Sequence, residues 1–433
     1  MQMHCHGNML SRRWIRALIA AGLAIILGTP ASLHAFPSFA RQTGMACSSC
    51  HFQKYPALTA FGRGFEAAGY TTMGPQETVN GDRLSLPAIL NASIFVKVRY
   101  QKSNGTDLPG ERTTNAGELQ FPDEFVLLLG GRVSEHAGFA IEGQLAEHAA
   151  PFVAGFKMPF TFKLGSTIRA NVIPFTTDGL GVAYGFELLN TGAVRHFRVN
   201  ENRTAISAQQ YIRTATAAEG FAFVLVDPKW FVNVTPWSPN HFAGAEGLAN
   251  GSPSAVYLRA AVTPTVGTWD LGAGIQLWSG SAGTANEEGG TDDVGTRALA
   301  FDAQAQGAIG ALPLGVYVTY GKADASTAGG TRNLFNSNAR DRSATTVTAE
   351  LGVLKAPFVT VLGGYRFADS GRAEANSTDN AFTFGVNWMV AQNIGLHWVF
   401  NRFNGSTYAA GQSPMKPGGS GNMLNTLMLS AGF

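Results

Sequence analysis

The sequence predicts an all-β fold, a transmembrane antiparallel β-barrel of about 16 strands. Three observations predict it. From about residue 89 to the C-terminus, apolar and polar residues alternate in segments of about 10 residues, the length that a tilted strand needs to cross a bilayer. Short turns between these segments alternate with long loops rich in Gly, Asn, Ser and Thr. Charged residues make up 14% of the chain, against roughly 25% in an ordinary globular protein, whereas Gly (52 residues) and Phe (29 residues) are abundant.

Residues 1–35 have the pattern of an export signal peptide. Three arginines precede the apolar stretch 17–28, and residues 33–35 form a cleavage site of imperfect sequence. About 12 apolar residues are too few for a transmembrane helix. Cys5 would be removed with this leader, so the mature chain keeps two cysteines. It also keeps 28 basic and 29 acidic residues, which gives no electrostatic reason to expect nucleic-acid binding.

The two remaining cysteines lie in one cluster, Cys47-Ser48-Ser49-Cys50-His51. This is the C-x-x-C-H pattern of covalent c-type haem attachment. It predicts one haem c, attached through Cys47 and Cys50, with His51 as an axial ligand of the iron. Structural zinc would need about four ligands, and residues 36–135 contain no other Cys or His. A redox dithiol usually accompanies a βαβ pattern, which is absent here.

The haem module is expected over residues 36–70 and to consist mostly of one helix. Pro56 is a good first residue for that helix, and Gly69 is a good stop signal. Its apolar stripe would cover a haem face or pack on the barrel mouth, and contains Leu58, Phe61 and Phe65. About 35 residues are too few to bury a haem alone. We therefore expect the module to plug the periplasmic end of the barrel lumen and to use the barrel walls.

The sixth position on the iron has four candidate ligands. Met45 and Met73 lie close to the cluster in sequence, and a Met ligand would raise the reduction potential. His136 and His148 fall on the polar face of a strand predicted over 136–148, beside Glu142. Each histidine could instead be a hydrated pore-lining residue.

Two arginines and two aromatic residues are further candidates for haem contacts. Arg41 and Arg63 could pair with the haem propionates, because a guanidinium group suits carboxylates. Solvated surface charge is the alternative for both arginines. Phe61 and Phe65 are the candidates for packing on the ring.

Residues 71–88 are interpreted as a linker and residues 89–433 as the barrel. In 381–390, one face carries Phe, Val and Trp, and the other includes Thr, Gly and Asn. The segments 393–400, 297–307 and 269–278 repeat this alternation. Alternation alone leaves open a soluble barrel with its apolar face inside. The segment lengths and the alternating turn lengths favour the membrane barrel.

The ends of the barrel give its orientation. An even strand number places the N-terminal module on the rim of short turns, which is the periplasmic rim in such barrels. The strands near 203–216 and 219–234 have the least regular alternation. The chain stops at Phe433 on an alternating segment, which resembles the assembly signal of bacterial outer-membrane proteins.

Residues 37–70 resemble the front module of the outer-membrane fused monohaem cytochrome–porin family, whose members include the Fe(II) oxidases of iron-oxidising bacteria. Glu66 departs from this resemblance, because a basic residue is expected there. The remainder of the chain matches only in architecture. The matching residues are Phe39-Ala40-Arg41-Gln42-Thr43-Gly44, Cys47, Cys50, His51, Pro56, Leu58, Phe61-Gly62-Arg63, Phe65 and Gly69-Tyr70.

The resemblance implies an outer-membrane electron conduit. It would oxidise extracellular Fe(II) at a single c-type haem and pass the electron to a periplasmic c-type cytochrome or another carrier. Carboxylates on the polar faces of the strands could guide iron cations; the candidates are Glu142, Asp270, Asp302 and Glu350. Two other functions stay open: a redox role with another donor or acceptor on the same architecture, and a diffusion porin whose plug carries a haem.

Overall fold

The computed structural model describes residues 37–82, 84–104, 117–146, 153–177, 183–198, 206–239, 253–285, 291–327, 332–355, 358–372, 374–409 and 421–433. The predicted leader, residues 1–35, and the candidate ligand His148 lie outside these ranges. Among the helices in these ranges, none has the length and apolar character needed to span a membrane.

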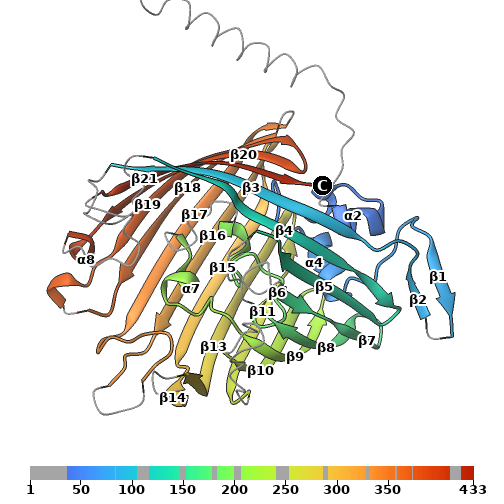
Figure 1. Ribbon diagram of the computed structural model, residues 1–433, viewed down its shortest axis with the longest axis horizontal. Helices are drawn as coiled ribbons and strands as arrows, with labels where there is room; N and C mark the ends of the chain where they lie inside the picture. The colour runs from blue at the N-terminus through green and yellow to red at the C-terminus, as the bar shows by residue number, and fades with distance from the viewer. Residues whose placement is uncertain are drawn as a thin grey trace, which may run out of the picture. The chain divides into compact units, whose positions relative to one another are not determined.

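The chain forms one closed antiparallel barrel of 16 wall strands, as predicted (Figure 1). β6 and β7 lie in line between the same two neighbours and form one interrupted wall strand. The wall strands are β3 (Ala92–Ser103), β4 (Glu118–Ser134), β5 (Ala137–Gln144), β6 (Val153–Lys157) with β7 (Phe160–Leu164), β8 (Ile168–Thr176), β9 (Glu219–Asp227), β10 (Trp230–Ser238), β11 (Ala255–Val262), β13 (Trp269–Ala285), β15 (Ala298–Ile309), β16 (Leu312–Ala323), β17 (Arg342–Lys355), β18 (Phe358–Asp369), β19 (Asn380–Ala391), β20 (Ile394–Asn404) and β21 (Met423–Gly432), and β12 (Thr265–Val266) and β14 (Thr291–Gly295) extend the sheet beside β13.

The barrel closes between its first and last strands. β21 pairs with β3 from Leu424 opposite Ser103 to Gly432 opposite Phe95. The terminal residue continues this seam, because the Phe433 N–H donates to the Ile94 carbonyl at 3.0 Å and the Phe433 carbonyl accepts a bond from the Ile94 N–H at 2.8 Å. The last residue of the chain therefore takes part in closing the barrel.

The apolar faces of the strands point outward. In β19, Phe382 is 40% exposed, whereas Thr383 and Asn387 are fully buried in the lumen. In β21, Leu427 is 54% exposed and Thr426 is 1% exposed. Exposed apolar residues around a polar interior are the arrangement of outer-membrane barrels and the reverse of a soluble barrel. The predicted outer-membrane location is confirmed, and the soluble alternative is wrong.

Two predicted strands are placed differently. Residues 206–216, the described part of the strand predicted over 203–216, do not form a wall strand; the helix α7 (Ala208–Tyr211) lies there, inside the lumen. Residues 219–234 are not one strand either, because the chain turns at Pro228–Lys229 between β9 and β10. These two errors cancel in the strand count. The strand predicted over 136–148 is the shorter β5, and His136 lies in the turn before it.

The N-terminal module has three short helices instead of mostly one: α2 (Pro37–Thr43), α3 (Cys47–Cys50) and α4 (Ala60–Ala67). The prediction that Pro56 begins the helix is wrong. α4 begins after Thr59, whose hydroxyl caps it by accepting the Gly62 N–H at 3.2 Å. Gly69, with φ of +66°, ends the helical region as predicted.

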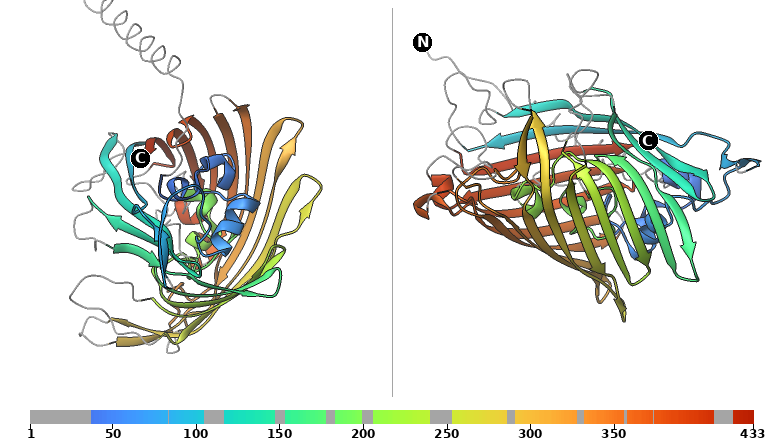
Figure 2. Two further views of the ribbon diagram at one scale, coloured as in Figure 1. Left: turned by 90° about the vertical axis from the view of Figure 1, so that its right-hand side faces the viewer. Right: turned by 90° about the horizontal axis from the view of Figure 1, so that it is seen from below.

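The module lies inside the barrel at the rim of short turns, as predicted (Figure 2). The segment interpreted as a linker also contains structure, since β1 (Thr78–Gly81) and β2 (Leu84–Pro87) form a hairpin. Arg132 of β4 fastens this hairpin by donating to the Ser85 carbonyl and hydroxyl, at 3.0 and 2.8 Å.

A second segment of the chain enters the lumen between β8 and β9. Its described parts are residues 183–198, including α5 (Arg195–Arg198), and 206–218, including α7. We call these parts the inserted segment. Phe186 and Leu189 pack against β8, β9 and β10, Phe197 packs against β19, β20 and β21, and Ile212 packs in a cluster with residues of β15 to β17. The inserted segment therefore contacts the barrel wall on several sides. The short helices η1 (Glu374–Asn376) and α8 (Ser406–Ala409) lie in connections at the opposite rim from the module.

Candidate haem site

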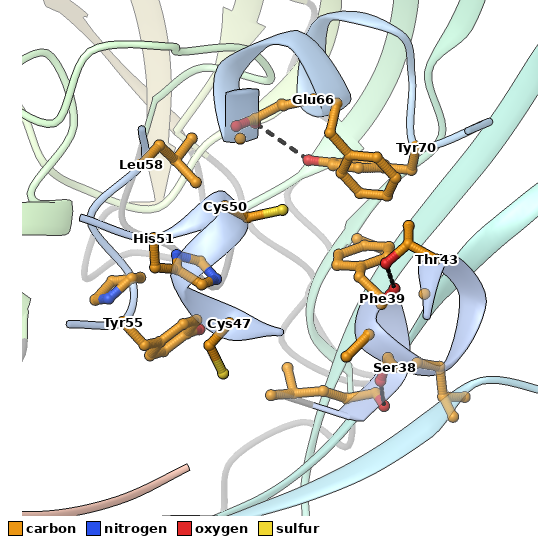
Figure 3. A pocket seen from close by; sticks show the side chains of 18 of the residues that line it. Ser38, Phe39, Thr43, Cys47, Cys50, His51, Tyr55, Leu58, Glu66 and Tyr70 are labelled. Atoms are coloured by element: carbon orange, nitrogen blue, oxygen red, sulfur yellow. Dashed lines mark hydrogen bonds between the residues drawn. The ribbon is translucent and has the colours of Figure 1, made fainter. Parts of the chain in front are cut away.

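The module and strands β4, β5 and β6 line a cavity of about 1100 Å³, part of which is open to solvent. We call it the first cavity. Figure 3 shows Cys47, Cys50 and His51 facing Phe39 and Tyr70 across it. The other lining residues are mostly apolar; they include Leu58, Phe65, Leu128, Leu129, Ile141 and Phe156. The walls from β4 to β6 supply the apolar surface that so short a module lacks.

The two cysteines lie at the ends of α3, one helical turn whose closing bond joins the His51 N–H to the Cys47 carbonyl at 2.8 Å. Both carry thiols. Burial raises the pKa of the Cys50 thiol. The turn places Cys47, Cys50 and His51 on the wall of one cavity. α4 packs directly on this turn at Gly62, where a Cβ would lie 2.2 Å from the Cys50 carbonyl oxygen.

The His51 ring is hydrogen-bonded from Nδ1 to the Ala57 carbonyl, at 3.3 Å. A carbonyl only accepts, so Nδ1 carries the proton and Nε2 keeps the lone pair that a metal needs. Burial lowers the pKa of His51 to about 4, with a smaller contribution in the same direction from the charge of Arg195. The imidazole is therefore neutral at neutral pH, the state in which histidine binds iron.

Glu66 of α4 forms a buried ion-pair group with Lys157 and Arg195 beside the first cavity. The Glu66 carboxylate accepts bonds from Lys157 at 3.0 Å and from Arg195 at 2.6 Å, and from the Tyr70 hydroxyl at 3.1 Å. Burial alone would raise the pKa of Glu66, but the two cations outweigh it and lower the pKa. Arg195 belongs to the inserted segment and Lys157 to β6, so this group joins three parts of the chain.

A hydrogen-bonded contact also joins the inserted segment to the module. The side chain of Asn190 accepts the Leu58 N–H at 2.7 Å and donates to the Leu58 carbonyl at 3.1 Å. Its backbone N–H donates to Gln304 of the wall at 2.8 Å. The inserted segment thus holds the backbone of Leu58, a residue that lines the first cavity.

Among the candidates for the sixth ligand, the structure brings only Met45 to the first cavity. Met45 lines it and is 38% exposed. Met73 lies after α4, outside the cavity lining, and His136 lies exposed in the turn before β5. His148 lies outside the described residues. Of the described candidates, Met45 alone is placed where it could be the sixth ligand.

The structure places the candidate arginines away from the first cavity. Arg41 donates to the Ala92 carbonyl at the barrel rim, and Arg63 forms a two-bond ion pair with Asp270, both bonds at 2.6 Å. Phe65 lines the cavity, where its ring meets Phe39 edge to face at a centroid distance of 5.2 Å. The predicted stripe is incomplete, because Phe61 is 48% exposed and Leu58 precedes the helix.

The four candidate carboxylates for guiding iron lie on lumen-facing positions, as the alternation predicts. Three of them are in ion pairs: Asp270 with Arg63, Asp302 with Arg259 at 2.6 Å, and Glu350 with Lys54. Glu142 lines the first cavity and lies 3.9 Å from Arg198. Their paired cations offset most of the negative charge that would attract iron, so a guiding role stays a prediction.

The residues present fit a c-type haem. A porphyrin needs an apolar slot, and the first cavity provides one, with two thiols and a neutral imidazole on one wall. Sequence reasoning gave no site role to several residues that build this site. They are Phe39 and Tyr70, which it noted only as part of the family resemblance, and Tyr55, Lys157 and Arg195. Phe39 and Tyr70 flank the C-x-x-C-H pattern and stack at 4.9 Å, so an aromatic count near the motif would have found them. Nothing in the local sequence indicates Lys157 or Arg195, because only the closed barrel brings them to Glu66.

Comparison with known proteins gives structural likenesses only. No protein-family model and no curated protein matches the chain. In-vitro folded OmpT of Vibrio cholerae is similar with a TM-score of 0.47 and 11% identity, over 82% of this chain and 100% of that chain. OprB of Pseudomonas putida gives 0.49 and 10%, over 80% and 94%, and the outer membrane channel DcaP of Acinetobacter baumannii gives 0.45 and 11%, over 79% and 97%. Strand pairing and the exposed apolar faces of the strands establish the barrel.

Proposed function

We propose that this protein is an outer-membrane electron conduit that oxidises extracellular Fe(II) at a single c-type haem and passes the electron to a periplasmic carrier. One observation carries the proposal. The two thiols and the imidazole of the C-x-x-C-H pattern line one apolar cavity, enclosed by the wall of a membrane barrel. The choice of Fe(II) as donor is supported by the resemblance of residues 37–70 to the fused cytochrome–porin family.

Each residue at the site has a role in this proposal. Cys47 and Cys50 would hold the haem covalently, and His51 would present Nε2 to the iron while its Nδ1–H is fixed by the Ala57 carbonyl. The haem, when bound, supplies a one-electron couple, which matches the one electron that Fe(II) gives up on becoming Fe(III). Apolar walls keep water from the iron, and burial together with axial ligation sets the potential. Met45 is the candidate sixth ligand.

The position of the module suits transfer to a periplasmic carrier. It lies at the short-turn rim, which faces the periplasm in outer-membrane barrels. Ser48 and Ser49, between the two cysteines, are exposed there. A periplasmic c-type cytochrome or another carrier could therefore approach the edge of the haem.

A second candidate function is electron transfer with another donor or acceptor through the same site. The same cavity supports it, because none of the lining residues is specific for iron. The reduction potential of the bound haem separates the two, since a strongly negative value would favour export of electrons to an extracellular acceptor.

The test uses the full chain purified from outer membranes in detergent. We expect a c-type absorption spectrum that survives denaturation, and reduction of the haem on addition of Fe(II) in stopped-flow at several pH values. Cys47→Ala with Cys50→Ala should abolish covalent haem and leave the barrel folded, and His51→Ala should keep attachment but change the optical bands. A wild-type protein without covalent haem contradicts the proposal, and a haem that stays oxidised in Fe(II) removes iron as its donor.

A further inference from the structure

A buried arginine without an acidic partner lies at the end of the lumen opposite the module. Arg342 begins β17, faces the lumen and is 4% exposed. Its Nε donates a long bond of 3.4 Å to the Ser370 carbonyl, and its Nη1 has no hydrogen-bond partner. No carboxylate of the described residues forms an ion pair with Arg342. Burial of an unpaired charge is strongly unfavourable, so this guanidinium group lacks the partner that its burial requires.

The inserted segment satisfies this arginine only in part. The Arg342 guanidinium lies over the Tyr211 ring, 5.8 Å from its centroid, which is close to the limit of about 6 Å for attraction between a cation and an aromatic face. Arg366 lies over the same ring at 4.5 Å. Asp379 lies 3.4 Å from Arg366 and accepts the Tyr211 hydroxyl at 3.1 Å. The carboxylate beside this ring is therefore committed to Arg366.

Two further arginines lie beside Arg342. Arg213 follows Tyr211 by two residues in the inserted segment, and Arg372 follows Ser370 by two residues in the connection between β18 and β19. Tyr211 and Ser370 both contact Arg342, and the charges of Arg213 and Arg372 repel its charge. In the described part of the chain, neither of the two forms an ion pair. Arg213 is exposed and Arg372 is half-buried, so solvent reaches the group from their side.

Two acidic side chains of the same rim have cations of their own. Asp369, at the end of β18, lies 3.8 Å from Arg340, and Asp341 binds Lys322 at 2.7 Å. The inserted segment, β17 and the β18–β19 connection thus each bring one arginine to this place without a described carboxylate to pair with it. This excess of positive charge, part of it buried, is the electrostatic pattern of an anion-binding site.

We propose that Arg213, Arg342 and Arg372 bind a free tetrahedral oxyanion of the phosphate and sulfate class at the long-loop end of the lumen. Guanidinium groups present paired N–H donors that match the oxygens of such an anion. The lumen-facing position of Arg342 favours a soluble anion over a phosphate group of lipopolysaccharide outside the wall. The bound anion joins the inserted segment to β17 and to the β18–β19 connection. The site is independent of the proposed haem.

The test measures phosphate binding to the full-length protein in detergent, freed of lipopolysaccharide and phosphate. Isothermal titration calorimetry with inorganic phosphate should show saturable binding to the wild type. The affinity should fall about tenfold or more in Arg342→Gln and in Arg213→Gln, because each change removes a charged hydrogen-bond donor. Arg340→Gln is the matched control, since it removes the same charge from the same rim where Arg340 is 44% exposed and lies near Asp369. Its affinity should stay within about twofold of the wild type.

Hydrogen–deuterium exchange locates the bound anion. With phosphate at about 100 times its Kd, peptides covering 206–218 and 366–379 should exchange up to about 100-fold more slowly, whereas peptides of the module should be unchanged. Arg342→Lys keeps the charge without the paired donors, so its affinity should lie between those of the wild type and Arg342→Gln. The exposed position of Arg213 keeps the test available if Arg342→Gln does not fold.

Two results would overturn the inference. The first is a wild type that does not bind phosphate, or that binds it no more tightly than Arg213→Gln and Arg342→Gln. The second is protection of the same peptides by added lipopolysaccharide but not by phosphate, which would assign the arginines to a lipid phosphate. Neither result bears on the proposed function, because no step of this test uses the haem.

Discussion

The buried charges around Glu66 allow a quantitative test of how the module is held in the barrel. Glu66→Gln leaves Lys157 and Arg195 buried without their carboxylate, while the side-chain volume stays nearly the same. Removal of one partner from a buried ion pair costs about 3–5 kcal/mol. Both cations are at most 6% exposed at their side chains, so solvent screening is small. The equilibrium for opening the module should therefore rise roughly 10²- to 10³-fold.

Hydrogen–deuterium exchange on the full-length protein in detergent measures this opening. Peptides covering residues 54–70 should exchange faster by that factor, whereas peptides of β19 and β20 should be unchanged, because local opening need not unfold the wall. The double variant Glu66→Gln with Lys157→Met should recover part of the lost stability of the module, because it removes one of the two buried cations left without the carboxylate. Lys322→Gln is the matched control. The ion pair of Lys322 with Asp341, at 2.7 Å, is solvent-exposed, because the Lys322 side chain is 37% exposed. Such an exposed pair contributes only about 0–1 kcal/mol to stability. Exchange in Glu66→Gln no faster than in this control would refute the reasoning.

Three further predictions follow from single positions. Gly62→Ala puts a Cβ 2.2 Å from the Cys50 carbonyl oxygen, so α4 must move away from the turn that carries both cysteines. The amount of covalent haem per protein, measured by absorbance, should therefore fall. Normal haem loading would contradict the close packing. Asn190→Ala removes two hydrogen bonds to Leu58 and should cost about 1–3 kcal/mol, read as faster exchange at the Leu58 amide; unchanged exchange would show that the contact is not stabilising. Leu427→Arg places a charge on the lipid face and should cost about 2–4 kcal/mol in reversible unfolding from lipid vesicles, with Leu427→Ala as control; equal stability of the two variants would mean that this face does not meet lipid.

The barrel was predictable from the sequence because lipid enforces a period of two. Phe382 and Thr383 must point to opposite faces, and each hairpin repeats the same constraint. The turn at Pro228–Lys229 was missed although Asp227-Pro228 is a turn signal between two alternating runs. The clear alternation on both sides of it can be mistaken for one long strand.

The inserted segment could not be found in the same way. Most residues of 183–198 and 206–218 are buried among other side chains, so they need neither a period of two nor a helical stripe. The partners of Arg195 and Arg198 are more than 50 residues away in sequence, and only barrel closure brings them together. The C-x-x-C-H pattern was readable because covalent attachment needs three residues at fixed local spacing.

The packing of the lumen bears on what crosses this barrel. A diffusion porin needs a water-filled path between its rims. Here the described parts of the inserted segment contact the walls on several sides, and Arg259 joins it to β15 through Glu187 and Asp302 with a complete set of short bonds. The module occupies the short-turn end and is bonded to the inserted segment through Glu66 and Asn190. Two interlocked plugs oppose solute flow, but an electron needs only a cofactor and close packing. This packing of the described residues supports the proposed electron conduit over the alternative of a diffusion porin.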